Sequence, residues 1–189
     1  MYHQTTYNKL KSIGIICRAR KVLHKNTLVT LYYTFIYPYL NYCCTVWGTA
    51  AATYLSRLVI LQKKIVRIIS GKPRLFPTLG LFHNLGILRI DLLSKFKLSI
   101  FCFKYLNNEL PGVFNGFVTP VSDIHEYYTR SSPLLYIHTP RTVYAENSVK
   151  FQAPLAWNSL NSQLRQIPFI ASFKRSLKLH LINSLTDVW

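Results

Sequence analysis

The stretch TYLSRLVILQKKIVRIISG, Thr53–Gly71, predicts one amphipathic helix with a recognisable start and end. Thr53 is a residue type that accepts hydrogen bonds from the first turn of a helix, and Gly71 is the type that most often follows the last turn. At about 100° per residue, apolar side chains gather on one broad face. They are Tyr54, Leu55, Leu58, Leu61, Ile65, Ile68 and Ile69. This face predicts a buried side against which the rest of the chain packs.

The opposite face of the same helix is cationic. It carries Arg57, Lys63, Lys64 and Arg67, with only Ile60 between them, and the segment contains no acidic residue. Taken alone, such a face is the ordinary solvated side of a surface helix. The composition of the whole chain favours a second interpretation, in which these four side chains bind a polyanion.

The charge balance of the 189 residues is strongly basic. There are 23 Lys and Arg against 6 Asp and Glu, for a formal net charge of +17. A field of this sign and size attracts polyanions, with nucleic acid the leading candidate and an anionic membrane surface the second. Half of the residues are hydrophobic, which predicts a packed core rather than a disordered chain.

The N-terminal part predicts two further helices. The first, over 2–22, carries a second cationic cluster at its end, Arg18, Arg20 and Lys21. The next segment has no charged residue from Asn26 to Ser56, so a single membrane span over Leu28–Trp47 is one alternative. Its many Tyr and Thr residues and Pro38 favour a buried helix kinked at the proline. Its tyrosines either pack in the core or stack on bases; they are Tyr32, Tyr33, Tyr37, Tyr39 and Tyr42.

The remainder of the chain predicts helices over 78–85, 92–107 and 170–185, together with a short β-hairpin. The composition shifts at Thr119, and the paired strands are expected at Leu134–His138 and Ser148–Gln152. The fold class is therefore mainly α, a basic helical bundle followed by a mixed tail with a β-hairpin and a C-terminal helix. Three segments are expected, 1–72, 73–118 and a mixed α/β tail over 119–189.

The sequence offers no constellation for catalysis. Its acids are scattered, without the Asp-Asp pair that a two-metal polymerase or nuclease requires. No His or Cys spacing predicts a metal site, and no glycine loop predicts a nucleotide cofactor. We therefore expect no catalytic residue, no metal, no cofactor and no enzyme activity from this chain alone. Without a signal peptide at Met1, an intracellular, reduced protein of the nucleus or cytoplasm is expected, not a secreted one.

Several motifs, in order, carry a resemblance to a known family. They are SIGIICRAR (Ser12–Arg20), LYYTFIYPYLNYCCTVWG (Leu31–Gly48), LQKKIVRIISG (Leu61–Gly71), LFHNLGILRI (Leu81–Ile90), KYLNNELP (Lys104–Pro111), HEYYTRSS (His125–Ser132), WNSL (Trp157–Leu160) and FKRSLKLHL (Phe173–Leu181). Their order and spacing, over nearly the whole chain, resemble the C-terminal part of non-LTR (LINE-type) retrotransposon reverse transcriptases.

The resemblance implies a thumb-like region over about 2–71, followed by the less characterised tail of that family. The family's endonuclease and its palm, with the metal-binding Asp pair, have no counterpart here. A thumb grips RNA or an RNA/DNA template–primer duplex by its backbone, and the missing palm would be its protein partner. Arg57, Lys63, Lys64 and Arg67 are the first candidates for this grip, and Arg18, Arg20 and Lys21 the second. An independent basic RNA- or DNA-binding module is the alternative.

Overall fold

The chain is mainly α-helical, as predicted. The computed structural model describes residues 13–49, 52–124 and 134–184, and these ranges hold eleven α-helices and no β-strand. The first half of the predicted N-terminal helix and the HEYYTRSS motif lie outside the described residues. No helix in the described ranges is both long enough and apolar enough to cross a membrane.

The helices form two compact units. Unit 1 is Met1–Cys44, Ala50–Leu93 and His180–Trp189, and unit 2 is Thr45–Thr49 and Ser94–Leu179. These units are defined by packing, whereas the three segments expected from the sequence mark changes in composition, so that division stays a prediction.

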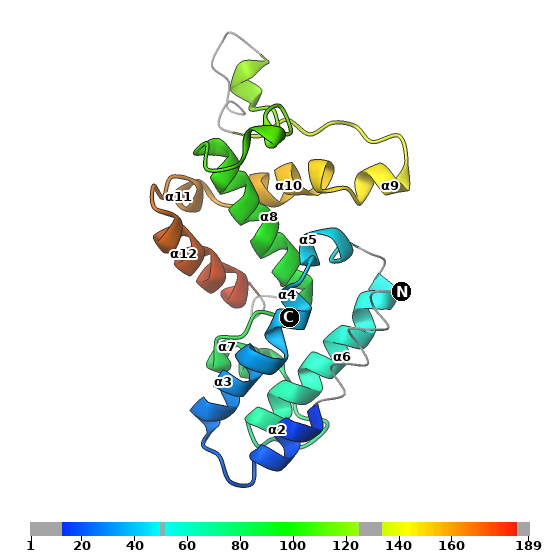
Figure 1. Cartoon of the computed structure of the whole chain (residues 1–189), viewed down its shortest axis with the longest axis vertical. Helices are drawn as coiled ribbons and strands as arrows, with labels where there is room; N and C mark the ends of the chain where they lie inside the picture. Colours follow the sequence, from blue (N-terminus) through cyan, green and yellow to red (C-terminus); the bar gives the residue numbers. More distant parts are fainter. Residues whose placement is uncertain (1–12, 50–51, 125–133, 185–189) are drawn as a thin grey trace. The chain divides into compact units, whose positions relative to one another are not determined.

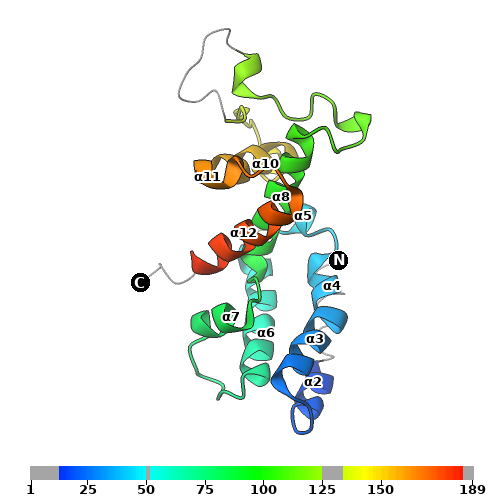
Figure 2. The ribbon, with the colours of Figure 1, turned by 90° about the vertical axis from the view of Figure 1, so that its left-hand side faces the viewer.

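Unit 1 is built around α6 (Ala52–Ile69). Figures 1 and 2 show α2 (Ile13–Ala19) and α3 (Lys25–Phe35) beside it, with α7 (Leu79–Leu85) next to it as well. Side chains from several of these helices are almost fully buried and form the core. They include Ile16, Leu28, Tyr32, Leu58, Ile65 and Phe82. Full burial of a Leu, Ile or Phe side chain stabilises a fold by roughly 1.5–3 kcal/mol.

The single helix expected over 28–47 is wrong, because the structure has three helices there. After α3 come α4 (Tyr37–Asn41) and α5 (Cys44–Trp47). Pro38 lies in the first turn of α4, where its missing N–H costs nothing, but it could not have continued α3. Cys43 has a positive φ of 49° and separates α4 from α5. The predicted kink at Pro38 is therefore a break.

The helix predicted over 53–71 is confirmed as α6, but its buried face is rotated from the predicted one. Gln62 and Val66 are buried, whereas Leu61 and Ile68 are only half-buried. The side chain of Tyr54 lies outside the described part of the chain. The rotation places an amide in the core, and three hydrogen bonds satisfy that amide.

The Gln62 side chain joins three segments of unit 1. Its Nε2 donates to the Tyr32 hydroxyl (2.9 Å) and to the Leu88 carbonyl (2.8 Å), and its Oε1 accepts from the Ile90 backbone N–H (2.9 Å). Ile90 opens α8 (Ile90–Leu106), so Gln62 satisfies one of the unpaired N–H groups of that helix start. The buried Gln62 amide therefore fixes the orientation of α6 relative to α3 and to the segment 88–90.

Unit 2 packs around an aromatic cluster. The Phe103 ring of α8 stacks on the Phe173 ring of α12 (Ile170–Asn183) at 4.7 Å between centroids. Trp157 of α10 (Val149–Asn158) lies 5.8 Å from Phe173. Short helices complete the unit: η1 (Gly112–Phe114), η2 (Val121–Asp123), α9 (Val143–Glu146) and α11 (Ser162–Arg165).

The β-hairpin expected between Leu134–His138 and Ser148–Gln152 is wrong. Ser148 caps α10, its hydroxyl accepting from the Phe151 N–H at 3.4 Å, and the residues after it form the first turns of that helix. The segment 134–138 pairs elsewhere, through an isolated bridge between Leu135 and Pro120. The Asn158 side chain bonds both the N–H and the carbonyl of Leu135 (2.9 and 2.8 Å), in place of a partner strand.

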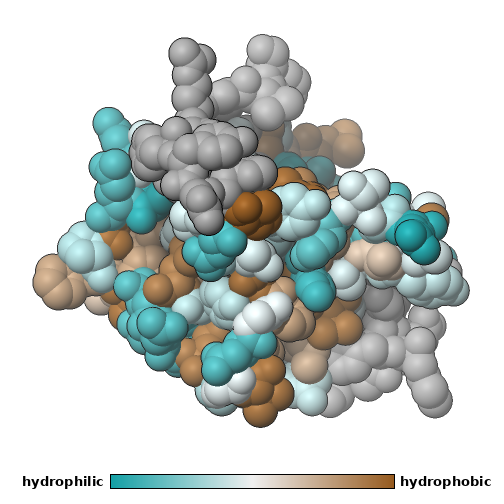
Figure 3. Space-filling model, turned by 90° about the horizontal axis from the view of Figure 1, so that it is seen from above, coloured by the Kyte–Doolittle hydropathy of each residue, from teal (hydrophilic) through white to brown (hydrophobic). Residues whose placement is uncertain are grey.

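Hydrophobic and hydrophilic side chains are mixed on the face of the molecule that Figure 3 shows, where brown areas lie between teal ones. Several large apolar side chains of the described residues are exposed, including Val22, Leu75, Val113 and Phe169. Single exposed apolar side chains are normal. One of them, Leu75, lies among cations.

Candidate nucleic-acid interface

The end of α6 is a Schellman motif that turns the chain sharply. The Lys72 N–H donates to the Arg67 carbonyl (3.0 Å) and the Gly71 N–H to the Ile68 carbonyl (3.2 Å). Gly71 has a φ of +68°, the left-handed conformation that this motif requires at that position. The next residues therefore run back beside α6 instead of continuing its axis.

The loop that follows, 72–77, is held by further contacts. The Phe76 N–H donates to the Pro73 carbonyl (3.1 Å), closing a turn, and Arg67 Nε donates to the Phe76 carbonyl (2.8 Å). The Lys72 ammonium lies 4.9 Å from the centre of the Phe76 ring, a cation–π contact. Pro73 and Pro77 have restricted φ angles. These contacts hold the 72–77 loop in a defined conformation.

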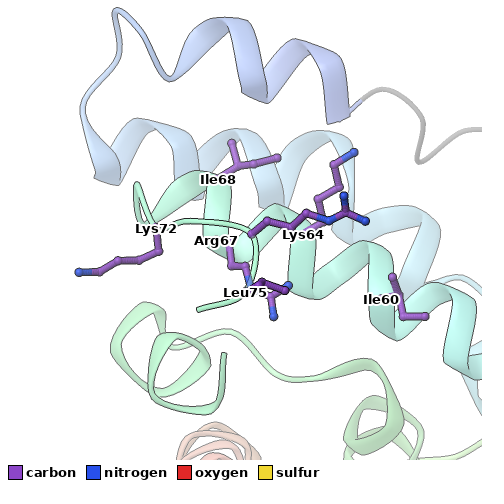
Figure 4. A pocket seen from close by; sticks show the side chains of 7 residues that line it. Ile60, Lys64, Arg67, Ile68, Lys72 and Leu75 are labelled. Carbon is purple, nitrogen blue, oxygen red and sulfur yellow. The ribbon is translucent and has the colours of Figure 1, made fainter. Parts of the chain in front are cut away.

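A groove of about 610 Å³ lies along α6 and this loop. Figure 4 shows Ile60, Lys64, Arg67 and Ile68 coming from α6, and Lys72 and Leu75 from the loop. Arg74 also lines it. Four of the seven lining residues are therefore cationic and three are aliphatic, and none is acidic.

The charges of the groove cations are not neutralised by any acidic residue in the described part of the chain. Among the residues that the structure describes, none of Lys64, Arg67, Lys72 and Arg74 forms an ion pair. Like charges gathered without a counter-charge produce a positive potential, and a groove concentrates it. The arrangement is suited to bind an anionic group.

The structure places the predicted residues of α6 in two sets. Lys64 and Arg67 line the groove. Arg57, two turns before Lys64, is exposed, and Lys63 is half-buried; both lie outside the groove lining. The sequence reasoning missed Lys72 and Arg74, because they belong to no helix face. The signal that could have found them is KPR directly after a helix-ending glycine.

The second predicted cluster is separate from the groove. Arg18 is in α2, and Arg20 and Lys21 follow its last residue; all three side chains are exposed. Arg18 Nε makes only a long hydrogen bond, 3.4 Å, to the Gly14 carbonyl one turn earlier. These cations remain candidates for additional contacts.

Of the five tyrosines of the uncharged segment, one belongs to the core, two are half-buried and two are exposed. Tyr32 is fully buried, and the Tyr33 hydroxyl donates to the Gly86 carbonyl at 3.1 Å. Burial raises the pKa of Tyr32, and burial, with smaller contributions from Tyr33 and Cys44, raises the pKa of Tyr37 to about 12. Only Tyr39 and Tyr42 of this set are exposed. Base stacking by Tyr32 would require the core to open.

No metal-binding group was found in the described parts of the chain, where no three His, Cys, Asp or Glu residues are placed to hold an ion together. Comparison of the chain with protein-family models, with curated proteins and with solved structures finds no match. The groove along α6 is therefore interpreted from its own residues.

Proposed function

We propose that this chain binds nucleic acid without sequence preference, through phosphate contacts of the groove cations on α6 and the 72–77 loop. The observation that carries the proposal is the set Lys64, Arg67, Lys72 and Arg74, which line one groove with no acidic residue among them. Lysine and arginine are the side chains that neutralise phosphates, and such contacts position a strand without reading its bases.

The resemblance to non-LTR retrotransposon reverse transcriptases extends this proposal. In that interpretation unit 1 contains a thumb-like region that grips RNA or an RNA/DNA template–primer backbone, and the palm that performs the chemistry is missing. The chain alone is then a nucleic-acid-binding fragment and not an enzyme, and primer extension with Mg²⁺ should give no product. An independent RNA- or DNA-binding module would bind in the same way; a palm-encoding frame upstream in the genomic DNA distinguishes the two.

The experiment removes three groove cations by the substitutions Lys64→Gln, Lys72→Gln and Arg74→Gln. Arg67 is kept because its hydrogen bond to Phe76 holds the loop. If each side chain contacts one phosphate, the slope of log affinity against log salt falls by about 0.7–0.9 per contact. The loss of affinity should be equal for two unrelated sequences, because backbone contacts carry no sequence information.

A matched control removes three exposed cations of unit 2, Lys150→Gln, Lys174→Gln and Arg175→Gln. It changes the net charge by the same amount but leaves the groove intact. The proposal requires a smaller loss of slope in the control than in the groove variant, with both proteins folded by circular dichroism. Equal losses would mean that only total charge matters, and the groove would not be the binding site.

A further inference from the structure

The groove contains more than cations. Leu75 is 91% exposed and Ile60 is 64% exposed, and both line the groove with the four basic residues. Duplex nucleic acid presents mainly phosphates and sugars on its outside and keeps its bases stacked within. A duplex would therefore leave these aliphatic side chains in water. A ligand that satisfies both kinds of residue carries phosphates and uncovered apolar faces together.

The exposed position of Leu75 is built into the fold. The Schellman turn at Gly71, the turn from Pro73 to Phe76 and the Arg67–Phe76 hydrogen bond all hold the loop that carries it. Ile60 lies on α6, two turns before Arg67, so the helix positions it equally firmly. Two apolar side chains held outward on rigid elements can contact a ligand with little loss of conformational entropy.

We infer that the groove binds an unpaired nucleic-acid strand, with its cations on the phosphates and Leu75 and Ile60 against the faces of the bases. This inference rests on the proposed function and specifies its ligand. Grooves for single strands combine cations that follow the backbone with aromatic side chains on which bases stack. The groove at α6 has the cations, and aliphatic side chains take the place of the aromatic ones.

The test compares three ligands of equal length: a single strand with bases, an abasic strand with the same phosphates, and a blunt duplex. The wild-type chain should bind the base-bearing strand more tightly than the abasic one by about threefold to tenfold, the effect of burying a few apolar groups. Leu75→Ser, and separately Ile60→Ser, should each remove about half of the free energy behind this preference. Ile and Ser have similar helix propensities, so the second variant keeps α6 intact.

Val113→Ser is the matched control, because Val113 is 92% exposed and lies in unit 2. It should leave the preference for bases unchanged, and none of the three variants should alter duplex or abasic affinity. If Leu75→Ser and Ile60→Ser retain the preference, or weaken duplex binding equally, the inference is overturned while the proposed function stands. If the wild-type chain binds none of the three ligands, both fail.

Vesicles containing phosphatidylserine provide the remaining arm of the test. Cations beside exposed aliphatic side chains also suit an anionic membrane surface. If Leu75→Ser weakens vesicle binding but leaves the preference for base-bearing strands intact, the groove serves a lipid surface and the inference is wrong. In the described ranges, none of the four groove cations has an acidic partner, which favours a continuous polyanion as the ligand.

Discussion

Gly71 is the residue on which the shape of the groove most depends. Its φ of +68° is a conformation that side chains disfavour, although a Cβ there would meet no atom within 4 Å. Gly71→Ala should therefore destabilise unit 1 by about 1–2 kcal/mol, entirely through backbone strain. Thermal unfolding followed by circular dichroism measures this loss of stability. The affinity for a single nucleic-acid strand should also fall, because the 72–77 loop that lines the groove would shift.

Gly80→Ala is the control for that prediction. Gly80 lies within α7 and has no positive φ, and a Cβ added there would also meet no atom within 4 Å. Because alanine favours a helix over glycine, this change should raise stability by about 0.4–1 kcal/mol. If Gly71→Ala and Gly80→Ala changed the stability in the same direction, the role given to the Schellman turn would be contradicted.

Gln62 links elements, and its replacement tests how unit 1 is held together. Gln62→Leu keeps a similar volume but removes the partners of the Ile90 N–H, the Leu88 carbonyl and the Tyr32 hydroxyl. Each buried polar group left without a partner costs about 1–3 kcal/mol. We expect a loss of at least about 2 kcal/mol in the free energy of unfolding, measured by urea titration.

The neighbouring substitution Leu61→Gln provides the comparison. Leu61 is only half-buried, so the change should cost less than Gln62→Leu even though it exchanges an apolar for a polar residue. The helix face predicted from the sequence would give the reverse order, because it includes Leu61 among the buried residues and does not include Gln62. If Gln62→Leu proves the milder change, the hydrogen bonds of Gln62 do not organise this unit.

Local signals predicted α6, α7, α8 and α12, but not the break at Pro38, the helix α10 or the contacts between helices. The C-terminal ends of α6 and α7 are predictable from the sequence because a glycine follows each helix. Gly71 and Gly86 both adopt the left-handed conformation that ends a helix. The rotation of α6 was not predictable from its own sequence. It follows from hydrogen bonds between Gln62 and residues that are at least 26 positions away in the chain. Ser148–Gln152 was mistaken for a strand because a short run of mixed residues fits either structure, and only the Ser148 cap decides it.

The candidate site was predictable in part for the same reason. Lys64 and Arg67 follow from the cationic face of one helix. Lys72 and Arg74 reach the groove because the chain reverses after Gly71 and the Arg67–Phe76 hydrogen bond holds it there. The position of Leu75 in the groove was not predictable from the sequence. A single exposed leucine in a loop belongs to no periodic hydrophobic pattern.

The net charge of +17 acts on the whole molecule. Self-repulsion of this kind destabilises the compact state, and salt screens it over about 10 Å at 0.1 M and about 3 Å at 1 M. The melting temperature should therefore rise with sodium chloride concentration over this range. The rise should be smaller in the Lys150, Lys174 and Arg175→Gln variant, and a melting temperature that falls with salt would contradict the argument.

The hydrogen bond from the Ile90 backbone N–H to Gln62 makes the hydrogen exchange of that N–H a measure of the opening of unit 1. The first N–H groups of a helix usually face water and exchange their hydrogen for deuterium rapidly. The Ile90 N–H is instead bound to a side chain of a different helix and is buried. It can exchange only when α6 separates from the start of α8, so its exchange rate measures that opening rather than the fraying of α8. In Gln62→Leu this single amide should lose its protection even in the folded chain.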